Sequence, residues 1–212
     1  MKKRFVSKRI AIFVGDFRII KYNKLVMKIY FVRHGKTQHN KNGLATGQID
    51  VPLVEEGLKE AEKTLEEMPN DFSEIYSSDL LRCRQTAKVL NRKLNISIFY
   101  DVRLRERNFG TLAGKNFKDF DPSGKLSKID YEQKYDYRPY GGESVENVKK
   151  RLFDFLNDVR SKCEGKKILI VTHGGIIRLL HNMLKGEVRE EIHNSSIHEF
   201  EFPDTIEEEN AR

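Results

Sequence analysis

The sequence lacks the features that mark membrane-spanning, disulfide-stabilised and cysteine-rich metal-binding proteins. It contains no run of the roughly 20 apolar residues that a membrane-spanning helix needs, and hydrophobic residues make up 38% of the chain against 33% charged residues. The two cysteines, Cys83 and Cys163, are too few for a disulfide framework or a cysteine-based metal site, and neither lies in a CxxC motif. We therefore expect a cytoplasmic protein that has no membrane partner, since a reducing compartment is the default for such a chain.

An excess of positive charge is also absent from most of the chain. The formal net charge is +7, but residues 1–26 hold eight Lys or Arg and one acidic residue, which leaves 31 residues of each sign in residues 27–212. Binding to a phosphate backbone needs a basic face. The neutral body of the chain therefore predicts no nucleic-acid partner.

Residues 1–26 are expected to form a basic N-terminal extension outside the domain, which spans residues 27–212. The apolar stretch at residues 10–15 is shorter than the roughly 7–15 residues of a signal-peptide core, and Asp16 follows at once. Met27 comes one residue before the first convincing strand, which suggests a translation start there. The alternative is a basic arm that contacts a partner or an anionic surface.

Short strand-like segments alternate with helical patterns along the rest of the chain. Residues rich in β-branched or aromatic side chains occupy 28–32, 74–78, 96–102 and 167–173. Between them, apolar residues recur at three- and four-residue steps, as at Leu58, Ala61, Leu65 and Met68, at Leu80, Cys83, Ala87, Leu90 and Leu94, and at Val145, Val148, Leu152, Phe155 and Val159. This alternation predicts one α/β domain, a three-layer sandwich with a mostly parallel central sheet flanked by helices, with residues 197–202 as a candidate edge strand.

Ionisable side chains follow all four predicted strands. Arg33 and His34 follow the first, Arg82 lies in the opening turn of a helix after the second, Glu106 follows the third and His173 ends the fourth. In open α/β sheets, ligands bind beyond the carboxyl ends of the strands. The sequence therefore predicts that these side chains meet in one site.

The residue types in this site suit phosphoryl transfer. Guanidinium groups match phosphoryl oxygens bidentately, so Arg33 and Arg82 are candidates for a clamp. A neutral imidazole, such as that of His34, can attack phosphorus and form a covalent intermediate. Glu106 can protonate the leaving oxygen, provided that burial or the phosphate charge raises its pKa. A metal is not expected, because the two histidines have no third ligand at suitable spacing and Arg33 repels a divalent cation.

Six segments in order, VRHGKTQHN, TGQIDVPLVEEGLKEA, IYSSDLLRCRQTA, LRERNFGTLAG, GGESVENVKKRL and VTHGGIIR, resemble the signature blocks of the histidine phosphatase superfamily, in its phosphoglycerate mutase-like branch. The resemblance implies that His34 is the phosphorylated nucleophile, Glu106 the proton donor, and His173, with Arg33 and Arg82, the rest of the phosphate pocket. It further implies phosphate or substrate contacts from Asn40, Thr46 and the backbone of Gly47, and no metal or organic cofactor. His39 and the segment FGTLAG depart from the family pattern near the pocket mouth, where substrate preference is set.

The length of the segment that covers the site separates the alternatives within this family. Residues 109–142 are expected to form a cover of loops and short helices, and only 34 residues separate Glu106 from the GGES segment. The mutases of the family use a longer, basic insertion, so we favour hydrolysis of a small phosphorylated metabolite over a cofactor-dependent phosphoglycerate mutase. An inactive phosphate-binding module is the third hypothesis, and it predicts a missing nucleophile or arginine. The sequence does not separate α-ribazole phosphatases from sugar-phosphate or fructose-2,6-bisphosphatase-type enzymes.

Overall fold

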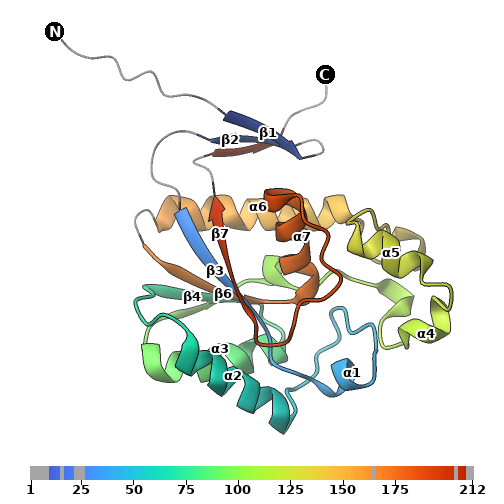
Figure 1. Ribbon diagram of the computed structural model, residues 1–212, viewed down its shortest axis with the longest axis horizontal. Helices are drawn as coiled ribbons and strands as arrows, with labels where there is room; N and C mark the ends of the chain where they lie inside the picture. The colour runs from blue at the N-terminus through green and yellow to red at the C-terminus, as the bar shows by residue number, and fades with distance from the viewer. Residues whose placement is uncertain (1–9, 15–16, 22–26, 164–165, 203–204, 209–212) are drawn as a thin grey trace.

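The computed structural model describes residues 10–14, 17–21, 27–163, 166–202 and 205–208. Much of the N-terminal segment lies outside these residues, so its assignment as an extension that ends at residue 26 stays a prediction. Two strands of it are described, β1 (Ile10–Val14) and β2 (Phe17–Lys21), and they pair antiparallel. Strand β2 also pairs antiparallel with β8 (Thr205–Glu208), which completes a small three-stranded sheet beside the long helix α6 (Figure 1).

The central sheet has five strands in the order β5-β4-β6-β3-β7. Its strands are β3 (Met27–Arg33), β4 (Glu74–Ser77), β5 (Ile98–Tyr100), β6 (Ile168–Thr172) and β7 (Ile197–Phe202). All neighbouring pairs are parallel except β3 and β7, which are antiparallel. The predicted mostly parallel sheet and the predicted edge strand at residues 197–202 are both confirmed.

Helices cover both faces of this sheet, so the predicted three-layer α/β sandwich is confirmed (Figure 1). The α-helices are α1 (Gln38–Lys41), α2 (Glu55–Glu67), α3 (Leu81–Leu94), α4 (Phe117–Phe120), α5 (Lys125–Tyr131), α6 (Val145–Lys162) and α7 (Gly174–Lys185). The 3₁₀ helices are η1 (Val102–Leu104), η2 (Gly110–Leu112) and η3 (Arg138–Tyr140). Helices α2 and α3 lie on one face, and α6 and α7 lie on the other (Figure 1).

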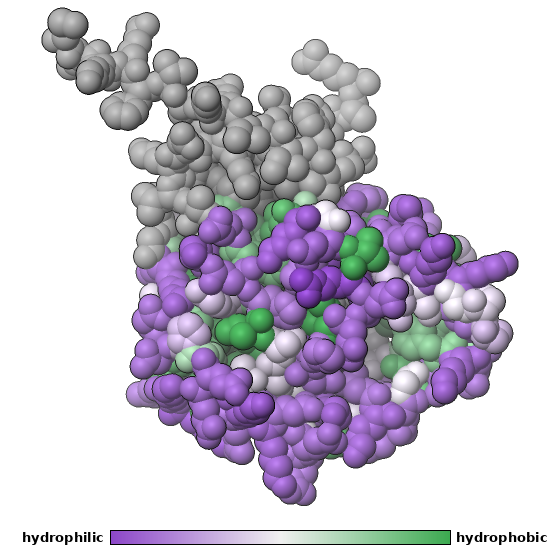
Figure 2. Space-filling view, in the orientation of Figure 1, coloured by the Kyte–Doolittle hydropathy of each residue, from purple (hydrophilic) through white to green (hydrophobic). Residues whose placement is uncertain are grey.

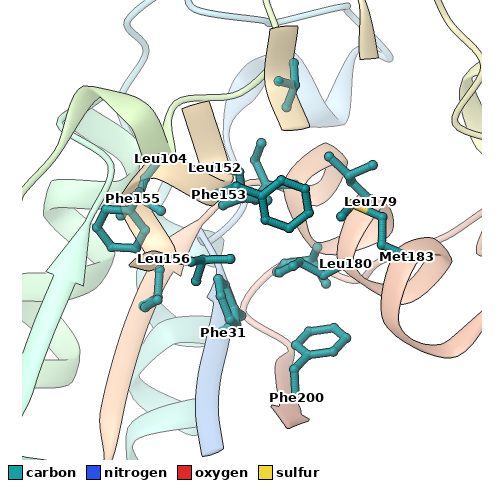
Figure 3. Close-up of a cluster of buried hydrophobic side chains, with 14 of the residues drawn as sticks. Phe31, Leu104, Leu152, Phe153, Phe155, Leu156, Leu179, Leu180, Met183 and Phe200 are labelled. Atoms are coloured by element: carbon teal, nitrogen blue, oxygen red, sulfur yellow. The ribbon is translucent and has the colours of Figure 1, made fainter. Parts of the chain in front are cut away.

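Strand β6 divides the hydrophobic core into two clusters. Its side chains alternate, so that Ile168 and Ile170 pack with α6 and α7, whereas Leu169 and Val171 pack with α2 and α3. All four are fully buried, and each such side chain contributes about 1.5–3 kcal/mol to stability. Figure 3 shows the first cluster, where Phe31 of β3 points toward side chains of α6 and α7. The buried strand positions hold the carboxyl ends of β3, β4 and β6 in fixed register.

Helices α3 and α7 begin directly at these carboxyl ends. The backbone N–H of Leu81, the first residue of α3, donates to Asp50 Oδ1 at 2.5 Å. His173 is the residue immediately before α7, which ends at Gly186 in the left-handed conformation that glycine adopts most easily. The two helix starts therefore place Arg82 and His173 beside the strand ends.

The segment 109–142 carries η2, α4, α5 and η3 and contributes no strand to either sheet. Its helices α4 and α5 lie beside the sheet at one end of the molecule (Figure 1). Backbone hydrogen bonds connect it to the loop after α1: Ala45 donates to Lys115, and Phe117 donates to Gly43. Residues 109–142 are called the cover below.

The face of the molecule seen in Figure 2 is mostly hydrophilic, with hydrophobic residues gathered in small separate patches. Within the described residues, no helix combines the length and the apolar character that a bilayer crossing requires.

Candidate active site

A cavity of about 530 Å³ opens at the carboxyl ends of β3 and β6. It is bounded by the loop after β3, by the starts of α3 and α7 and by the cover. Seven of the eight residues that the sequence singled out line it: Arg33, His34, Asn40, Thr46, Gly47, Arg82 and Glu106. The eighth, His173, lies behind His34. The structure thus brings together residues that are up to 140 positions apart in the chain.

His34 is held in one orientation and one protonation state. Its ring nitrogen Nδ1 is 2.8 Å from the carbonyl oxygen of Gly35, and since a carbonyl only accepts, Nδ1 carries the hydrogen. Nε2 bonds no residue that the structure describes, which leaves its lone pair open to the cavity. Burial, together with the positive charges of Arg82 and Arg33, holds the pKa of His34 well below its ordinary value. His34 is therefore a neutral imidazole with a free acceptor nitrogen.

His173 packs against His34 without lining the cavity itself. It is fully buried, and its ring lies 5.2 Å from the His34 ring at an interplanar angle of 63°. Its Nε2 is 2.9 Å from the hydroxyl of Ser78, at the end of β4. Burial, followed by the charge of Arg82 and the proximity of His34, lowers the pKa of His173 well below its ordinary value. Both rings are therefore uncharged at neutral pH.

Arg82 is 1% exposed and is fixed by backbone oxygens. Its Nη2 donates to the carbonyl of Gly47 at 2.7 Å and its Nη1 to that of Ile49 at 2.8 Å, whereas its buried Nε has no partner among the described residues. The Gly47 backbone, expected to contact phosphate, thus contacts Arg82 through its carbonyl. Gly47 has φ +53° and packs against Phe109, so this bend of the chain favours glycine.

Arg33 reaches the cavity from the end of β3. Its Nη1 donates to the carbonyl of Ile192, and its buried Nε has no partner within the described chain. Burial, with smaller effects from Arg178 and Arg82, lowers the pKa of Arg33 to about 10, so the group stays cationic at neutral pH. Arg33 and Arg82 therefore present two positive charges and unsatisfied N–H groups beside His34.

The carboxylate of Glu106 accepts two backbone hydrogen bonds. Gly175 N–H donates to Oε2 at 3.0 Å and Arg107 N–H donates to Oε1 at 2.9 Å. Burial, the largest influence, disfavours the ionised form, but the charge of Arg107, these two donors and the charge of Arg82 outweigh it and lower the pKa of Glu106. Burial alone therefore does not prepare Glu106 as an acid. A bound phosphate dianion is the group that can raise its pKa.

Asn40 and Thr46 lie on the loop side of the cavity. Asn40 Oδ1 accepts from the backbone N–H of Thr37 at 3.1 Å and from the amide of Asn194 at 3.2 Å, which fixes the side chain by its oxygen end. Its own Nδ2 group bonds no described residue and is free to donate to a ligand. The Thr46 hydroxyl lies 3.5 Å from the carbonyl of Leu44, and its backbone carbonyl accepts from Ile49 N–H at 3.1 Å.

Five further charged residues line the cavity without having been assigned a role from the sequence. Lys41 and Lys118 are exposed, whereas Arg107, Asp130 and Arg178 form a connected group. Asp130 Oδ1 accepts from Arg107 Nη2 at 2.7 Å and from Arg178 Nη1 at 3.2 Å. The sequence indicated a place near the site for two of these residues only: Arg107 directly follows Glu106, and Arg178 ends the segment VTHGGIIR. Nothing in the sequence marked Asp130, which lies in the irregular cover.

Arg151 of α6 holds the chain that carries Glu106. Its Nη1 donates to the carbonyls of Arg103 and Arg105 at 2.6 and 2.7 Å, and its Nη2 donates to the carbonyl of Glu106 at 3.2 Å. Its Nε donates to Glu143 at 2.9 Å. One guanidinium thus fixes three backbone carbonyls within residues 103–106. Over the part of the chain that is described, no group of three or more His, Cys, Asp or Glu side chains is arranged to hold a metal ion.

Comparison with known proteins gives a consistent family. The family model of the histidine phosphatase superfamily (branch 1) matches residues 29–205. Phosphoglycerate mutase-like protein 4 of Arabidopsis thaliana is 32% identical over 187 residues, which are 84% of this chain and 80% of that protein. The metal-independent phosphoserine phosphatase of A. thaliana is 32% identical over 167 residues, 76% of this chain and 70% of that protein.

A solved structure of similar fold is that of the mycobacterial glucosyl-3-phosphoglycerate phosphatase in complex with VO3. The two structures superpose with a TM-score of 0.72 at 27% sequence identity. The superposition covers 82% of this chain and 92% of the chain of the mycobacterial phosphatase. The similarity therefore extends over the whole cavity-bearing domain.

Proposed function

The chain belongs to the histidine phosphatase superfamily and is a phosphatase, and we propose that it hydrolyses a small phosphorylated metabolite through a phosphohistidine at His34, without a metal ion. The observation that carries this proposal is the state of His34. Its Nδ1 hydrogen is donated to Gly35, its Nε2 is free, and Arg33 and Arg82 stand beside it.

In the first step, His34 Nε2 forms a bond to phosphorus while the bond from phosphorus to the ester oxygen breaks. Arg33 and Arg82 offset the charge on the phosphoryl oxygens. Glu106, protonated once the phosphate dianion is bound, gives its proton to the leaving oxygen, and the alcohol departs.

In the second step, water attacks the phosphohistidine. The Glu106 carboxylate takes one proton from the water as the oxygen bonds to phosphorus, and the bond from phosphorus to His34 Nε2 breaks. Inorganic phosphate leaves and His34 returns to its neutral form. His173 keeps the His34 ring in place through both steps by packing against it at 5.2 Å.

Water is the proposed acceptor because the cover is short. The cover consists of α4, α5 and two 3₁₀ helices, and it leaves a cavity that is open beside Lys41, Asn42 and Lys118. A cavity of about 530 Å³ has room for a drug-sized ligand or a smaller metabolite with water beside it. The phosphoserine phosphatase named above supports a small phosphate ester as substrate.

The test is hydrolysis of p-nitrophenyl phosphate in the presence of EDTA, with the wild type beside His34→Ala. We expect turnover by the wild type and a loss of at least about 1,000-fold in the variant, because alanine lacks the nitrogen that forms the covalent intermediate. Acid-labile, base-stable incorporation of ³²P into the wild type alone would identify the phosphohistidine. Equal turnover by both proteins would show that His34 is not the nucleophile.

Transfer of the phosphoryl group to a second hydroxyl of bound phosphoglycerate, with no release of phosphate, would instead identify a mutase. Tight binding of phosphate by a protein that never turns over would identify a binding module.

A further inference from the structure

Asp130 of the cover is a buried carboxylate that the catalytic steps above do not use. It is 2% exposed and accepts hydrogen bonds from three side chains. Oδ1 accepts from Arg107 at 2.7 Å and from Arg178 at 3.2 Å, and Oδ2 accepts from the hydroxyl of Tyr137 at 2.8 Å. A carboxylate without solvent needs such partners, and so many donors fix its position.

Arg107 connects Asp130 to Glu106. Its Nη2 bonds Asp130, and its Nη1 lies 3.8 Å from Glu106 Oε1. The rings of Phe109 and Tyr135 are 5.1 and 5.0 Å from its guanidinium carbon, so aromatic side chains hold the group in place.

The Nη1 of Arg107 lies beside Glu106 and makes no hydrogen bond to a described residue. Both Nη1 and Nε are buried without a hydrogen-bond partner among the described residues, and a Cβ added to Gly175 would overlap Nη1. This end of the guanidinium therefore interacts with the Glu106 carboxylate through its positive charge and not through a hydrogen bond.

Apart from the exposed Lys41 and Lys118, the charged side chains named so far around the cavity balance in two groups. Glu106 and Asp130 carry two negative charges, and Arg107 and Arg178 carry two positive charges beside them. Arg33 and Arg82 remain, and their two positive charges match a bound phosphate dianion. Without the charge of Asp130, two arginines would face Glu106 alone and would hold its carboxylate ionised.

We propose that Asp130 is a positioning residue for the general acid: it keeps Arg107 and Arg178 engaged, so that Glu106 can take up the proton that it passes to the leaving group. This role of Asp130 rests on the proposed function, because it concerns Glu106 as the general acid of the proposed phosphatase reaction. It also means that the cover contributes to catalysis through this one side chain.

Other charged or titratable groups face Glu106 from every neighbouring element. They are Arg33 of β3, Arg82 and Cys83 of α3, Tyr135 of the cover and Arg178 of α7. None of these is altered in the test below, so a change in the behaviour of Glu106 is assigned to Asp130.

The test compares Asp130→Asn with the wild type on two aryl phosphates, p-nitrophenyl phosphate as the good and phenyl phosphate as the poor leaving group, between pH 5 and 9. We expect the ratio of kcat/KM for the poor over the good substrate to fall about tenfold. The alkaline limb of the pH profile for the poor substrate should move to a pH about one unit lower, the size of the pKa shift that one neighbouring charge imposes.

Asp121→Asn is the matched control, because Asp121 is a buried carboxylate of the same cover that accepts from the backbone N–H groups of Leu126 and Ser127 and not from an arginine.

A double-mutant cycle separates this role from a structural one. In a Glu106→Gln background the acid is already missing, so Asp130→Asn should change the leaving-group ratio by less than twofold. An equal loss on both substrates, without a pH shift and with full additivity to Glu106→Gln, would overturn the proposal.

Two further measurements keep the proposal testable if Asp130→Asn folds poorly or if the wild type shows no phosphatase activity. Asp130→Glu keeps the charge and should recover at least half of the lost ratio if Asp130→Asn folds poorly. The titration of Glu106 can be followed directly by ¹³C NMR of Glu-labelled protein with inorganic phosphate bound, using Glu106→Gln for assignment. A lower midpoint in Asp130→Asn supports the proposal and an unchanged midpoint rejects it, even if the wild type hydrolyses no ester and the proposed function fails.

Discussion

The guanidinium of Arg82 and the backbone carbonyl of Gly47 are 2.7 Å apart, a contact between the start of α3 and a loop 35 residues earlier in the chain. Through it, a side chain that lines the cavity also fixes the loop that bounds the cavity. Its second donor, on the carbonyl of Ile49, makes the contact a fork that only arginine can provide.

Arg82→Lys should therefore lower kcat/KM by about 100-fold or more, although the positive charge is kept. A lysine ammonium cannot span both carbonyls and the phosphate, and each lost charge-assisted hydrogen bond costs about 1.5–3 kcal/mol. Steady-state kinetics on p-nitrophenyl phosphate measures this. Arg84→Lys, on the exposed side of the same helix, is the control and should stay within twofold of the wild type. Equal effects of the two variants would contradict the fork.

Gly175→Ala should abolish most of the activity while leaving most of the fold. A Cβ at this position would overlap both Glu106 Oε1 and Arg107 Nη1, so the carboxylate must leave its two backbone donors. Gly186→Ala is the matched variant: this glycine has φ +66° and open space around it, so alanine should cost about 1 kcal/mol of stability and no activity. Thermal melts and kcat/KM on both variants distinguish a catalytic clash from backbone strain. The expectation is wrong if Gly175→Ala keeps more than a tenth of the wild-type activity.

Arg151→Ala should reduce both stability and activity. The substitution removes the shared donor of the Arg103 and Arg105 carbonyls, whereas the Glu106 carbonyl keeps a hydrogen bond from Gln48. An acceptor left unsatisfied when buried costs about 1–3 kcal/mol, and these carbonyls are partly buried. Urea unfolding gives the free energy change, and the kinetics should show a larger loss on phenyl phosphate than on p-nitrophenyl phosphate because Glu106 is displaced. Lys150→Ala, an exposed neighbour on α6, should change neither quantity. A loss of stability without any change in the leaving-group ratio would show that Arg151 does not position the acid.

Stability should decrease as the pH falls from about 7 to 5. Burial lowers the folded-state pKa of four histidines: His34, His173, His181 and His198, the last to about 4. In the unfolded chain a histidine has its ordinary pKa of about 6.5. As the pH falls below this value, the unfolded chain therefore binds protons before the folded protein does. Stability then rises with pH wherever the unfolded state holds more protons. The lowered carboxyl pKa values act at still lower pH and do not contribute to this window.

Urea unfolding at several pH values measures this dependence. His198→Gln should reduce the loss between pH 7 and 5, whereas His193→Gln, at an exposed position, should leave the profile unchanged. A chain that becomes more stable on acidification through this window would refute the assignment of neutral buried histidines.

The strands and most helices could be predicted because their sequence patterns are local. Strand β6 is a continuous apolar run that is buried along its whole length, and the apolar spacing of α2, α3 and α6 matches the faces that they bury. Strand β5 is shorter than expected, since its ladder ends at Tyr100 and η1 begins at Val102. The positions of the site residues followed from the rule that carboxyl ends of parallel strands meet.

The contacts that tune the site could not be predicted, because their partners are distant in sequence. Glu106 was expected to act as an acid if burial or the phosphate charge raised its pKa. Burial does not suffice, because the charge of Arg107 and a donor 69 residues away, Gly175 N–H, lower the pKa of Glu106. Asp130 lies on a short helix without apolar periodicity, and its partner Arg178 is 48 residues further along. His173, predicted to belong to the phosphate pocket, is fully buried against the His34 ring and does not line the cavity itself. The roles of these residues stay predictions until the variants are measured.

The pairing of Arg33 with Thr172 in the ladder between β3 and β6 has one more consequence. His34 and His173 each come one residue after these partners, and His34 N–H continues the ladder by donating to the Thr172 carbonyl at 2.9 Å. The separation of the two imidazoles is thus set by the distance between adjacent strands, about 4.8 Å, and a slip of one residue would turn one of them to the opposite face. The geometry of the two histidines is therefore a property of the sheet as a whole, so substitutions deep in its core can alter the chemistry while substitutions in the surrounding loops leave the histidine pair unchanged.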